Sequence, residues 1–219
     1  MRFGLLGEPE PLPYVQPGLT GRHAAVGPEE VQPDDRADER VRAAGRRGTQ
    51  DLGLLVLRLG VGGVLIAHSI QKAFGMWGGP GLAGFKNSLT DMGYQHADVL
   101  TYIAAGTQLA AGVLLVLGLF TPLGAAAALA YLTNDLLANA AAAHHAGHLS
   151  FFLPGGSEYQ ITLIAATAAI ILAGPGRLGF DAGRGWARRP FIGSIAALLV
   201  GIGAGVAAWV LLNGANPLG

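Results

Sequence analysis

Five long apolar segments dominate the chain, and each is interrupted by only a few polar side chains. A membrane-spanning helix needs about 20 apolar residues, because each residue advances the helix by about 1.5 Å across about 30 Å of hydrocarbon. Most of the five segments approach that length. They predict an all-α fold, a polytopic membrane helix bundle for which lipid is the solvent. The segments are Leu52–Ile70, Val99–Leu119, Pro122–Ala143, Tyr159–Gly174 and Phe191–Leu212.

The composition supports the membrane class and excludes several others. Apolar residues make up 51% of the chain and charged residues only 13%, and the formal net charge is +0, which gives no basis for a nucleic-acid partner. The chain has no cysteine, so a disulfide framework, a thiol relay and a cysteine-ligated metal centre are excluded within it. Any redox role therefore needs a bound cofactor or a partner protein.

The organisation changes after residue 50. Residues 1–50 carry many prolines and charges and few large apolar side chains, too little apolar surface to offset the entropy lost on ordering. We therefore predict a disordered cytoplasmic N-terminal tail over 1–50 and a four-helix membrane core over 51–181. Residues 182–219 are predicted to form a basic cytoplasmic loop, a fifth C-terminal transmembrane helix and a short outer tail.

Arginines gather at two places, before the first apolar segment and between the fourth and the fifth. With five crossings both groups lie on one face, and the positive-inside rule makes that face cytoplasmic. This predicts a multi-pass protein of the plasma membrane with a cytoplasmic N-terminus. Loop 71–98, rich in glycine and aromatic residues, then faces outside and is expected to be interfacial or partly re-entrant. The arginines are Arg36, Arg40, Arg42, Arg46, Arg47, Arg177, Arg184, Arg188 and Arg189.

Two local patterns concern helix ends and helix packing. Thr121 followed by Pro122 predicts an N-cap and a proline at the first helical position. Gly201 and Gly205 form a GxxxG pair in the last apolar segment. That pair suits either a dimer face or packing against the other helices of the same chain.

Arg58 is the first charged residue within an apolar segment. A charge in the hydrocarbon costs several kcal/mol unless it is paired, hydrated or able to reach the headgroups. Arg58 lies about 10 Å from the predicted cytoplasmic end, so snorkelling to the headgroups is one interpretation. The other is that it points inward, towards Gln108 or the carbonyls of neighbouring helices, and holds an anionic or quinone-like ligand.

Asp135 lies near the predicted bilayer centre, where a short carboxylate must be protonated, paired or hydrated. Asn139 shares its helix face at i, i+4, and His68 is reachable from the neighbouring helix. An Asp–His pair in a dry pocket suits a proton relay or a quinone-headgroup site. A hydrogen-bond network that only joins the helices is an equally compatible interpretation.

Histidines near the end of the third segment raise the question of a metal. His144 and His148 stand at i, i+4, and Glu158 could add an oxygen ligand. The pattern has no further ligand at a characteristic spacing. His144 and His148 are therefore weak candidates, and no metal site is predicted.

Three motifs follow one another in the order of a known family. The first includes Leu57-Arg58-Leu59-Gly60 and Ala67-His68-Ser69-Ile70-Gln71-Lys72-Ala73-Phe74-Gly75. The second runs from Gln108-Leu109-Ala110-Ala111-Gly112 into Phe120-Thr121-Pro122. The third runs from Gly156-Ser157-Glu158-Tyr159 to Gly179-Phe180-Asp181. Together they resemble the DoxX family of integral membrane proteins over about residues 52–181.

The resemblance implies a compact four-helix membrane core, to which the fifth helix and the tail are additions. Members of this family include membrane subunits associated with thiosulfate:quinone oxidoreduction. Others are the membrane component of an oxidative-stress complex, on which a soluble superoxide dismutase and a thiosulfate sulfurtransferase dock. At position 108 the family usually has Glu, and Asp135 is the residue that would supply the acid here. The residues at the family's polar positions are Arg58, His68, Gln71, Lys72, Gln108 and Glu158.

These observations define a candidate polar pocket and a function. We expect a membrane subunit or anchor of a redox-homeostasis complex, with quinone as the cofactor and soluble antioxidant or sulfurtransferase proteins as partners. Its own catalytic activity, as a subunit of a quinone-linked oxidoreductase, and its homo-oligomerisation are left open. The alternatives are a non-catalytic membrane scaffold and a small-solute transporter. The candidate pocket comprises Arg58, His68, Gln71, Lys72, Gln108, Asp135, Asn139 and Glu158.

Overall fold

The computed structural model describes residues 48–145, 156–182, 184 and 191–213. Several predictions fall outside these residues and stay predictions. They are the disordered state of the tail, the position of its arginines and the weak metal ligand His148.

The described residues form helices, apart from turns and one isolated bridge between Tyr94 and Asn213. The all-α class predicted from the apolar segments is therefore confirmed for this part of the chain. The elements are α2 (Gly48–Phe74), the short 3₁₀-helix η1 (Met76–Gly78), α3 (Gly81–Asp91), α4 (Ala97–Leu117), α5 (Thr121–His145), α6 (Glu158–Ala173) and α7 (Phe191–Leu212).

The loop expected at 71–98 is largely helical. Helix α2 continues to Phe74, so Gln71 and Lys72 lie in a helix and not in a loop as predicted. Helix α3 follows and buries Phe85 and Leu89, an i, i+4 pair, on one face. These two side chains pack in a cluster with Tyr94, Ala97, Ala138 and Trp209. An amphipathic helix thus occupies the segment that was expected to be interfacial or partly re-entrant.

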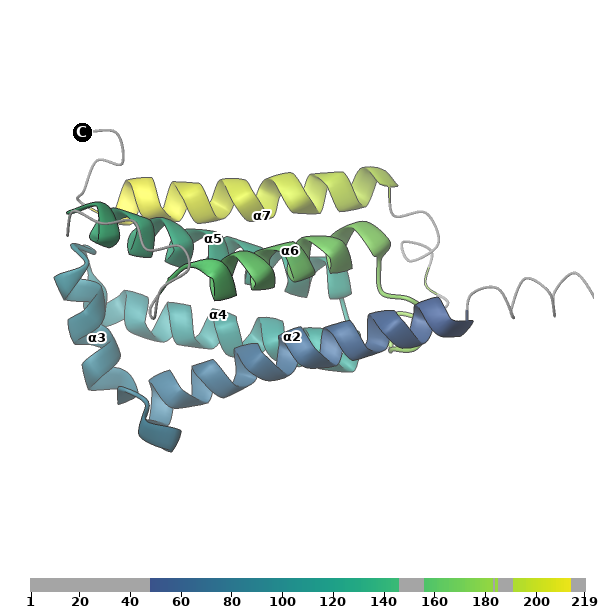
Figure 1. Cartoon of the computed structure of the whole chain (residues 1–219), viewed down its shortest axis with the longest axis horizontal. Helices are drawn as coiled ribbons and strands as arrows, with labels where there is room; N and C mark the ends of the chain where they lie inside the picture. The colour runs from purple at the N-terminus through teal and green to yellow at the C-terminus, as the bar shows by residue number, and fades with distance from the viewer. Residues whose placement is uncertain (1–47, 146–155, 183, 185–190, 214–219) are drawn as a thin grey trace, which may run out of the picture. The chain divides into compact units, whose positions relative to one another are not determined.

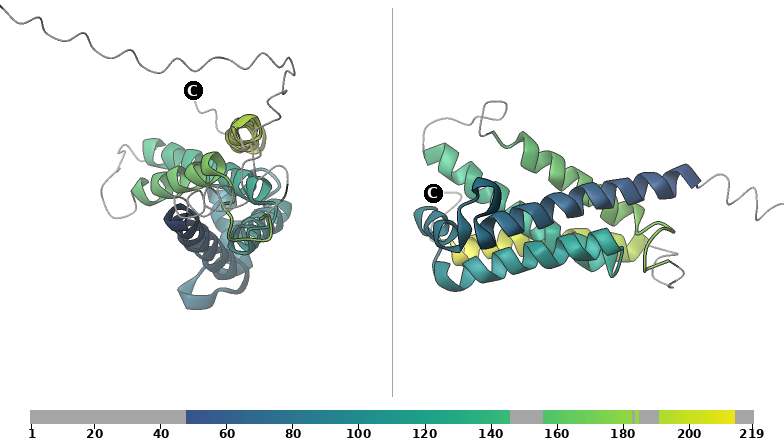
Figure 2. Two further views of the ribbon diagram at one scale, coloured as in Figure 1. Left: turned by 90° about the vertical axis from the view of Figure 1, so that its right-hand side faces the viewer. Right: turned by 90° about the horizontal axis from the view of Figure 1, so that it is seen from below.

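The long helices run side by side, and α3 lies across one end of the bundle (Figure 1). Contacts join α2 to α4, α4 to α5, α5 to α6 and α6 back to α2, which closes a ring of helices. Helix α7 packs against α5 and α6, and Figures 1 and 2 show it on the side opposite α2. One hydrophobic core lies inside the ring, and it contains the buried residues Val61, Leu65, Leu115, Leu129 and Ile170.

Glycines permit the closest helix contacts. At Gly62 a Cβ atom would lie 2.8 Å from the carbonyl oxygen of Gly112, and at Gly112 it would lie 2.8 Å from that of Gly62. In the last helix, a Cβ at Gly205 would lie 2.5 Å from the carbonyl oxygen of Ala130. Gly201 faces α5 in the same way. Of the two interpretations of the GxxxG pair, packing within the chain is therefore the correct one.

The apolar character of the helices supports a membrane protein. Among the described residues, three helices are long and apolar enough to cross a bilayer, namely Thr49–Phe74, Ala97–Leu117 and Ile192–Leu212. Helix α6 is apolar but has only 16 residues, and α5 has 25 residues but carries Asn134 and Asp135. A multi-pass membrane protein is thus supported, while the count of five crossings stays a prediction.

Candidate functional site

The predicted polar residues lie in two separate groups. Arg58 and Lys72 are both on α2, but about 21 Å of helix axis separates them. Arg58 contacts the segment after α6, whereas Gln108, its predicted partner, accepts a hydrogen bond from Lys72. The continuous polar pocket expected from the sequence is therefore divided between the two ends of the bundle.

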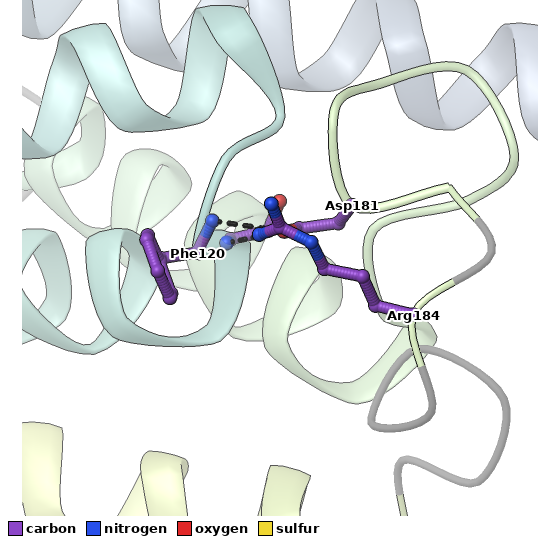
Figure 3. Close-up of polar contacts among 4 residues, drawn as sticks. Phe120, Asp181 and Arg184 are labelled. Atoms are coloured by element: carbon purple, nitrogen blue, oxygen red, sulfur yellow. Dashed lines mark hydrogen bonds and ion pairs between the residues drawn. The ribbon is translucent and has the colours of Figure 1, made fainter.

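At the end of the bundle where α5 begins, Asp181 is fully buried and caps α5. Its two carboxylate oxygens accept the backbone N–H groups of Phe120, at 3.0 Å, and of Thr121, at 2.8 Å (Figure 3). A carboxylate at a helix N-terminus satisfies free N–H donors and is favoured by the helix dipole. The sequence predicted Thr121 as the N-cap of this helix, and that prediction is wrong. Its hydroxyl is buried and meets no hydrogen-bond partner among the described residues.

Arg58 lies beside this cap. Its side chain is fully buried, so the snorkelling interpretation is wrong, and Nη2 donates to the backbone carbonyl of Leu178. Asp181 attracts its charge, and Arg184 forms an ion pair with the same carboxylate at 3.4 Å (Figure 3). Gly118 has a φ of +63° and leaves no room for a Cβ beside the guanidinium. The group holds the segment after α6 against α2 and α5.

At the opposite end of the bundle, across which α3 lies, Lys72 is surrounded by side chains from three helices. Its Nζ donates to Gln108 Oε1 at 3.3 Å and to the hydroxyl of Tyr131. The ammonium also lies 4.8 Å from the ring centroid of Phe85 and 4.7 Å from that of Tyr131. Aromatic faces at these distances stabilise a cation.

Asp135 and His68 complete this group but do not pair directly as predicted. The Asp135 carboxylate accepts a hydrogen bond from Gln160 Nε2 at 2.7 Å, and it attracts both Lys72 and His68. His68 Nε2 lies 3.2 Å from the hydroxyl of Tyr159. We call the set of His68, Lys72, Gln108, Tyr131, Asp135, Tyr159 and Gln160 the Lys72 cluster.

Residues 53–144 match the family model described as DoxX. The chain carries a DoxX domain. No curated protein and no solved structure matches the chain significantly. The predicted family is confirmed over the matched residues, while the third motif, at 156–181, lies beyond them. The DoxX domain and the apolar helices together support a membrane protein of the DoxX family.

The boundary of the DoxX domain divides the Lys72 cluster unequally. His68, Lys72, Gln108, Tyr131 and Asp135 lie within the matched residues. The side chains that contact His68 and Asp135 from α6 lie beyond them, as do Asp181 and the whole of α7. Residues inside and outside the matched range therefore both contribute side chains to the Lys72 cluster.

Other predicted site residues lie at the margin of the Lys72 cluster. Gln71 is a side-chain partner of His68. Asn139 is half-buried on α5, and Glu158 is exposed in the first turn of α6. His144 is exposed near the end of α5. In the described residues no group of three His, Asp or Glu side chains could hold a metal ion.

Sequence reasoning missed the aromatic members of the site. Tyr131 precedes Asp135 by one helical turn, so the i, i+4 rule that singled out Asn139 would also have found it. Tyr94 donates from its hydroxyl to Asn134 Oδ1 at 3.0 Å. Burial raises the pKa of Tyr94, so this hydroxyl keeps its proton at neutral pH. For Tyr94, which lies outside the long helices, the sequence offered no comparable signal.

Proposed function

We propose that this DoxX-domain protein is a membrane subunit of a redox-homeostasis complex whose Lys72 cluster binds the headgroup of a quinone. The position of Lys72 carries the proposal. Its ammonium lies within a helix bundle among Gln108, Phe85 and Tyr131 and is attracted by Asp135. An ammonium in such a place is costly unless it is paired, and intramembrane ionisable residues are functional candidates for that reason.

The donor set suits a small headgroup that carries carbonyl oxygens. Lys72, Tyr131 and Gln160 can each donate a hydrogen bond, and bonds from a charged donor are the stronger ones. Asp135 supplies negative charge opposite Lys72, at a site where Gln108 replaces the usual glutamate of the family. Bound quinone would supply the two-electron chemistry. The electrons come from a partner or a substrate, because the chain has no cysteine.

His68 provides a route for protons. Its Nε2 lies 3.2 Å from the hydroxyl of Tyr159, and it is attracted by Asp135. Tyr159 is partly exposed, with 48% of its surface accessible, so the pair connects the cluster to the surface of the bundle. An imidazole next to a hydroxyl can accept a proton on one side and donate one on the other.

The Lys72→Met variant should lose quinone binding. Methionine keeps the apolar volume but removes the ammonium, and hydrogen bonds to charged groups contribute about 1.5–3 kcal/mol, which corresponds to roughly ten- to hundredfold in affinity. The measurement is the rise in melting temperature of the purified protein in mild detergent on titration with a tail-less dimethoxy-methyl-benzoquinone. A ligand that binds only the native state raises that temperature.

Lys86→Met is the matched control for this titration. Lys86 is a cation on α3 that pairs with Asp98 and whose side chain is 47% exposed, so its variant should bind as the wild type does. Gln108→Leu tests the same donor network without removing a charge and should also weaken binding. An unchanged response in Lys72→Met, or no shift of the wild type at saturating quinone, would contradict quinone binding at this site.

The proposed complex is tested by capture of the full-length protein from native membranes. Soluble antioxidant or sulfurtransferase proteins should copurify and be identified by mass spectrometry. We place the N-terminal tail in the cytoplasm by the positive-inside rule, so deletion of residues 1–47 should reduce their recovery if the tail is the docking segment. Recovery of these partners without any quinone binding would instead favour the non-catalytic scaffold.

A further inference from the structure

A groove opens on the side of the bundle that carries α7. It has a volume of about 210 Å³ and is lined by residues of α3, α4, α5 and α7 together with Tyr94. Helices α4 and α7 both pack against α5, so the groove lies between them with α5 as its floor. None of its lining residues is charged. Because α7 lies outside the matched DoxX residues, this groove depends on the part of the chain that follows the DoxX domain.

The groove opens towards the face of the bundle that meets lipid. Ile103 lines it and is 56% exposed, and the neighbouring Val99 on α4 is 58% exposed. On the face of α7 that carries Ala204, Val200 and Leu211 are also exposed apolar side chains. Large apolar residues exposed on membrane-length helices face acyl chains. A molecule that enters the groove therefore comes from within the bilayer.

Polar groups are found towards one end of the groove. Tyr94 and Asn134 lie towards the α3 end, joined by their hydrogen bond, and Tyr131 lies one turn further along α5. Towards the opposite end the lining includes Ala127 and Ala204 and one polar residue, Thr107. From Leu212 to Ala204 the groove extends about 12 Å along α7. The groove has its aromatic hydroxyl and amide groups at one end and is mainly apolar over the remaining length, with Thr107 as the exception. Such a site matches an amphiphile with one narrow tail.

Tyr131 connects the groove to the Lys72 cluster. Its side chain lines the groove, and its hydroxyl accepts a hydrogen bond from Lys72 Nζ. A headgroup at the polar end is thus separated from Lys72 by a single side chain. The groove itself offers no cation to a phosphate, so it favours an uncharged headgroup over that of a phospholipid.

We propose that the groove between α4 and α7 is the lateral entrance for the lipophilic ligand of the Lys72 cluster and holds its single hydrocarbon tail. This inference rests on the proposed function, in which that ligand is a quinone. The hydrocarbon tail lies along α7, and the head points past Tyr94, Tyr131 and Asn134 into the Lys72 cluster.

The test compares a probe with a tail and a probe without one. Ala204→Phe places a ring in the groove, whereas the control Ala207→Phe places the same ring on α7 at an exposed position outside the lining. Each purified protein is titrated in detergent with the tail-less benzoquinone and with its decyl homologue. Partition of a probe into detergent is the same for all variants, so each affinity is expressed relative to the wild type.

We expect Ala204→Phe to bind the decyl probe about fivefold more weakly than the wild type or worse, because overpacking of this size costs at least that factor. Its affinity for the tail-less probe should change less than about twofold. Ala207→Phe should bind both probes as the wild type does. This pattern would assign the tail to the groove.

Three results would overturn the inference, and they differ from a failure of the proposed function. Unchanged binding of the decyl probe to Ala204→Phe would show that the tail lies elsewhere. An equal loss for both probes would show an effect on the head site. Phospholipid that copurifies with the wild type but not with Ala204→Phe, without any effect on the decyl probe, would make the groove a structural lipid site. If the wild type binds neither probe, the proposed function fails as well.

Discussion

The Asp181→Ala variant should unfold at a much lower denaturant concentration than the wild type, with a loss of about 3–5 kcal/mol in the free energy of unfolding. The carboxylate is fully buried and accepts two backbone N–H groups of α5. It also attracts the buried Arg58. Its removal leaves two backbone N–H donors without their acceptor and the buried Arg58 without an attracting negative charge, and a buried charge that loses its partner is strongly destabilising.

Asp51→Ala is the control for this prediction. Asp51 also accepts a backbone N–H group, that of Arg177 at 2.9 Å, but at an exposed position, so its removal should cost about 1 kcal/mol or less. Asp181→Asn should fall between the two, because the amide oxygen keeps one acceptor. Unfolding is followed by helix content on titration with a denaturing detergent. Equal midpoints for Asp181→Ala and Asp51→Ala would show that the cap contributes little.

The Gly112→Leu variant should separate α2 from α4 and destabilise the protein by about 1–3 kcal/mol or more. A Cβ at this position would lie 2.8 Å from the carbonyl oxygen of Gly62 and 2.8 Å from the side chain of Ile66. The backbone oxygen cannot move away without a shift of the whole helix. Close approach of small residues is a main source of helix association in lipid, so this contact is not readily replaced.

Gly106→Leu provides the matched control on the same helix. A Cβ at Gly106 meets nothing within 4 Å, and the residue is exposed on α4. This change should leave the melting temperature in mild detergent near that of the wild type, or raise it slightly, because leucine is the better helix former. If both variants melt at the same temperature, the contact between Gly62 and Gly112 is not a determinant of stability.

Features that depend on neighbouring residues could be predicted from the sequence. The long apolar segments predicted the helices, because hydrophobicity and length are properties of a single segment. The ordered motifs predicted the DoxX family, which the match at 53–144 confirms. The i, i+4 rule placed Asn139 on the face of Asp135, and the same rule extends to Tyr131.

Features that join distant residues could not be predicted. The cap of α5 comes from Asp181, which is 60 residues away from Thr121, while the local signal pointed to Thr121 itself. The predicted pair of Asp135 and His68 is replaced by contacts with Gln160 and Tyr159, since the start of α6 reaches both side chains. Rotation of each helix about its axis decides such contacts, and no single segment encodes that rotation.

By itself, the sequence determined that lipid surrounds this chain and that a few polar residues must be accommodated within its helices. Hydropathy is a local property and is read along one segment at a time. Only the tertiary structure decided that Arg58 and Lys72 serve opposite ends of the bundle, that Gly205 faces α5, and that α7 forms a groove behind Tyr131. These outcomes depend on which helix faces pack together, and that choice is made by the side chains of several helices at once.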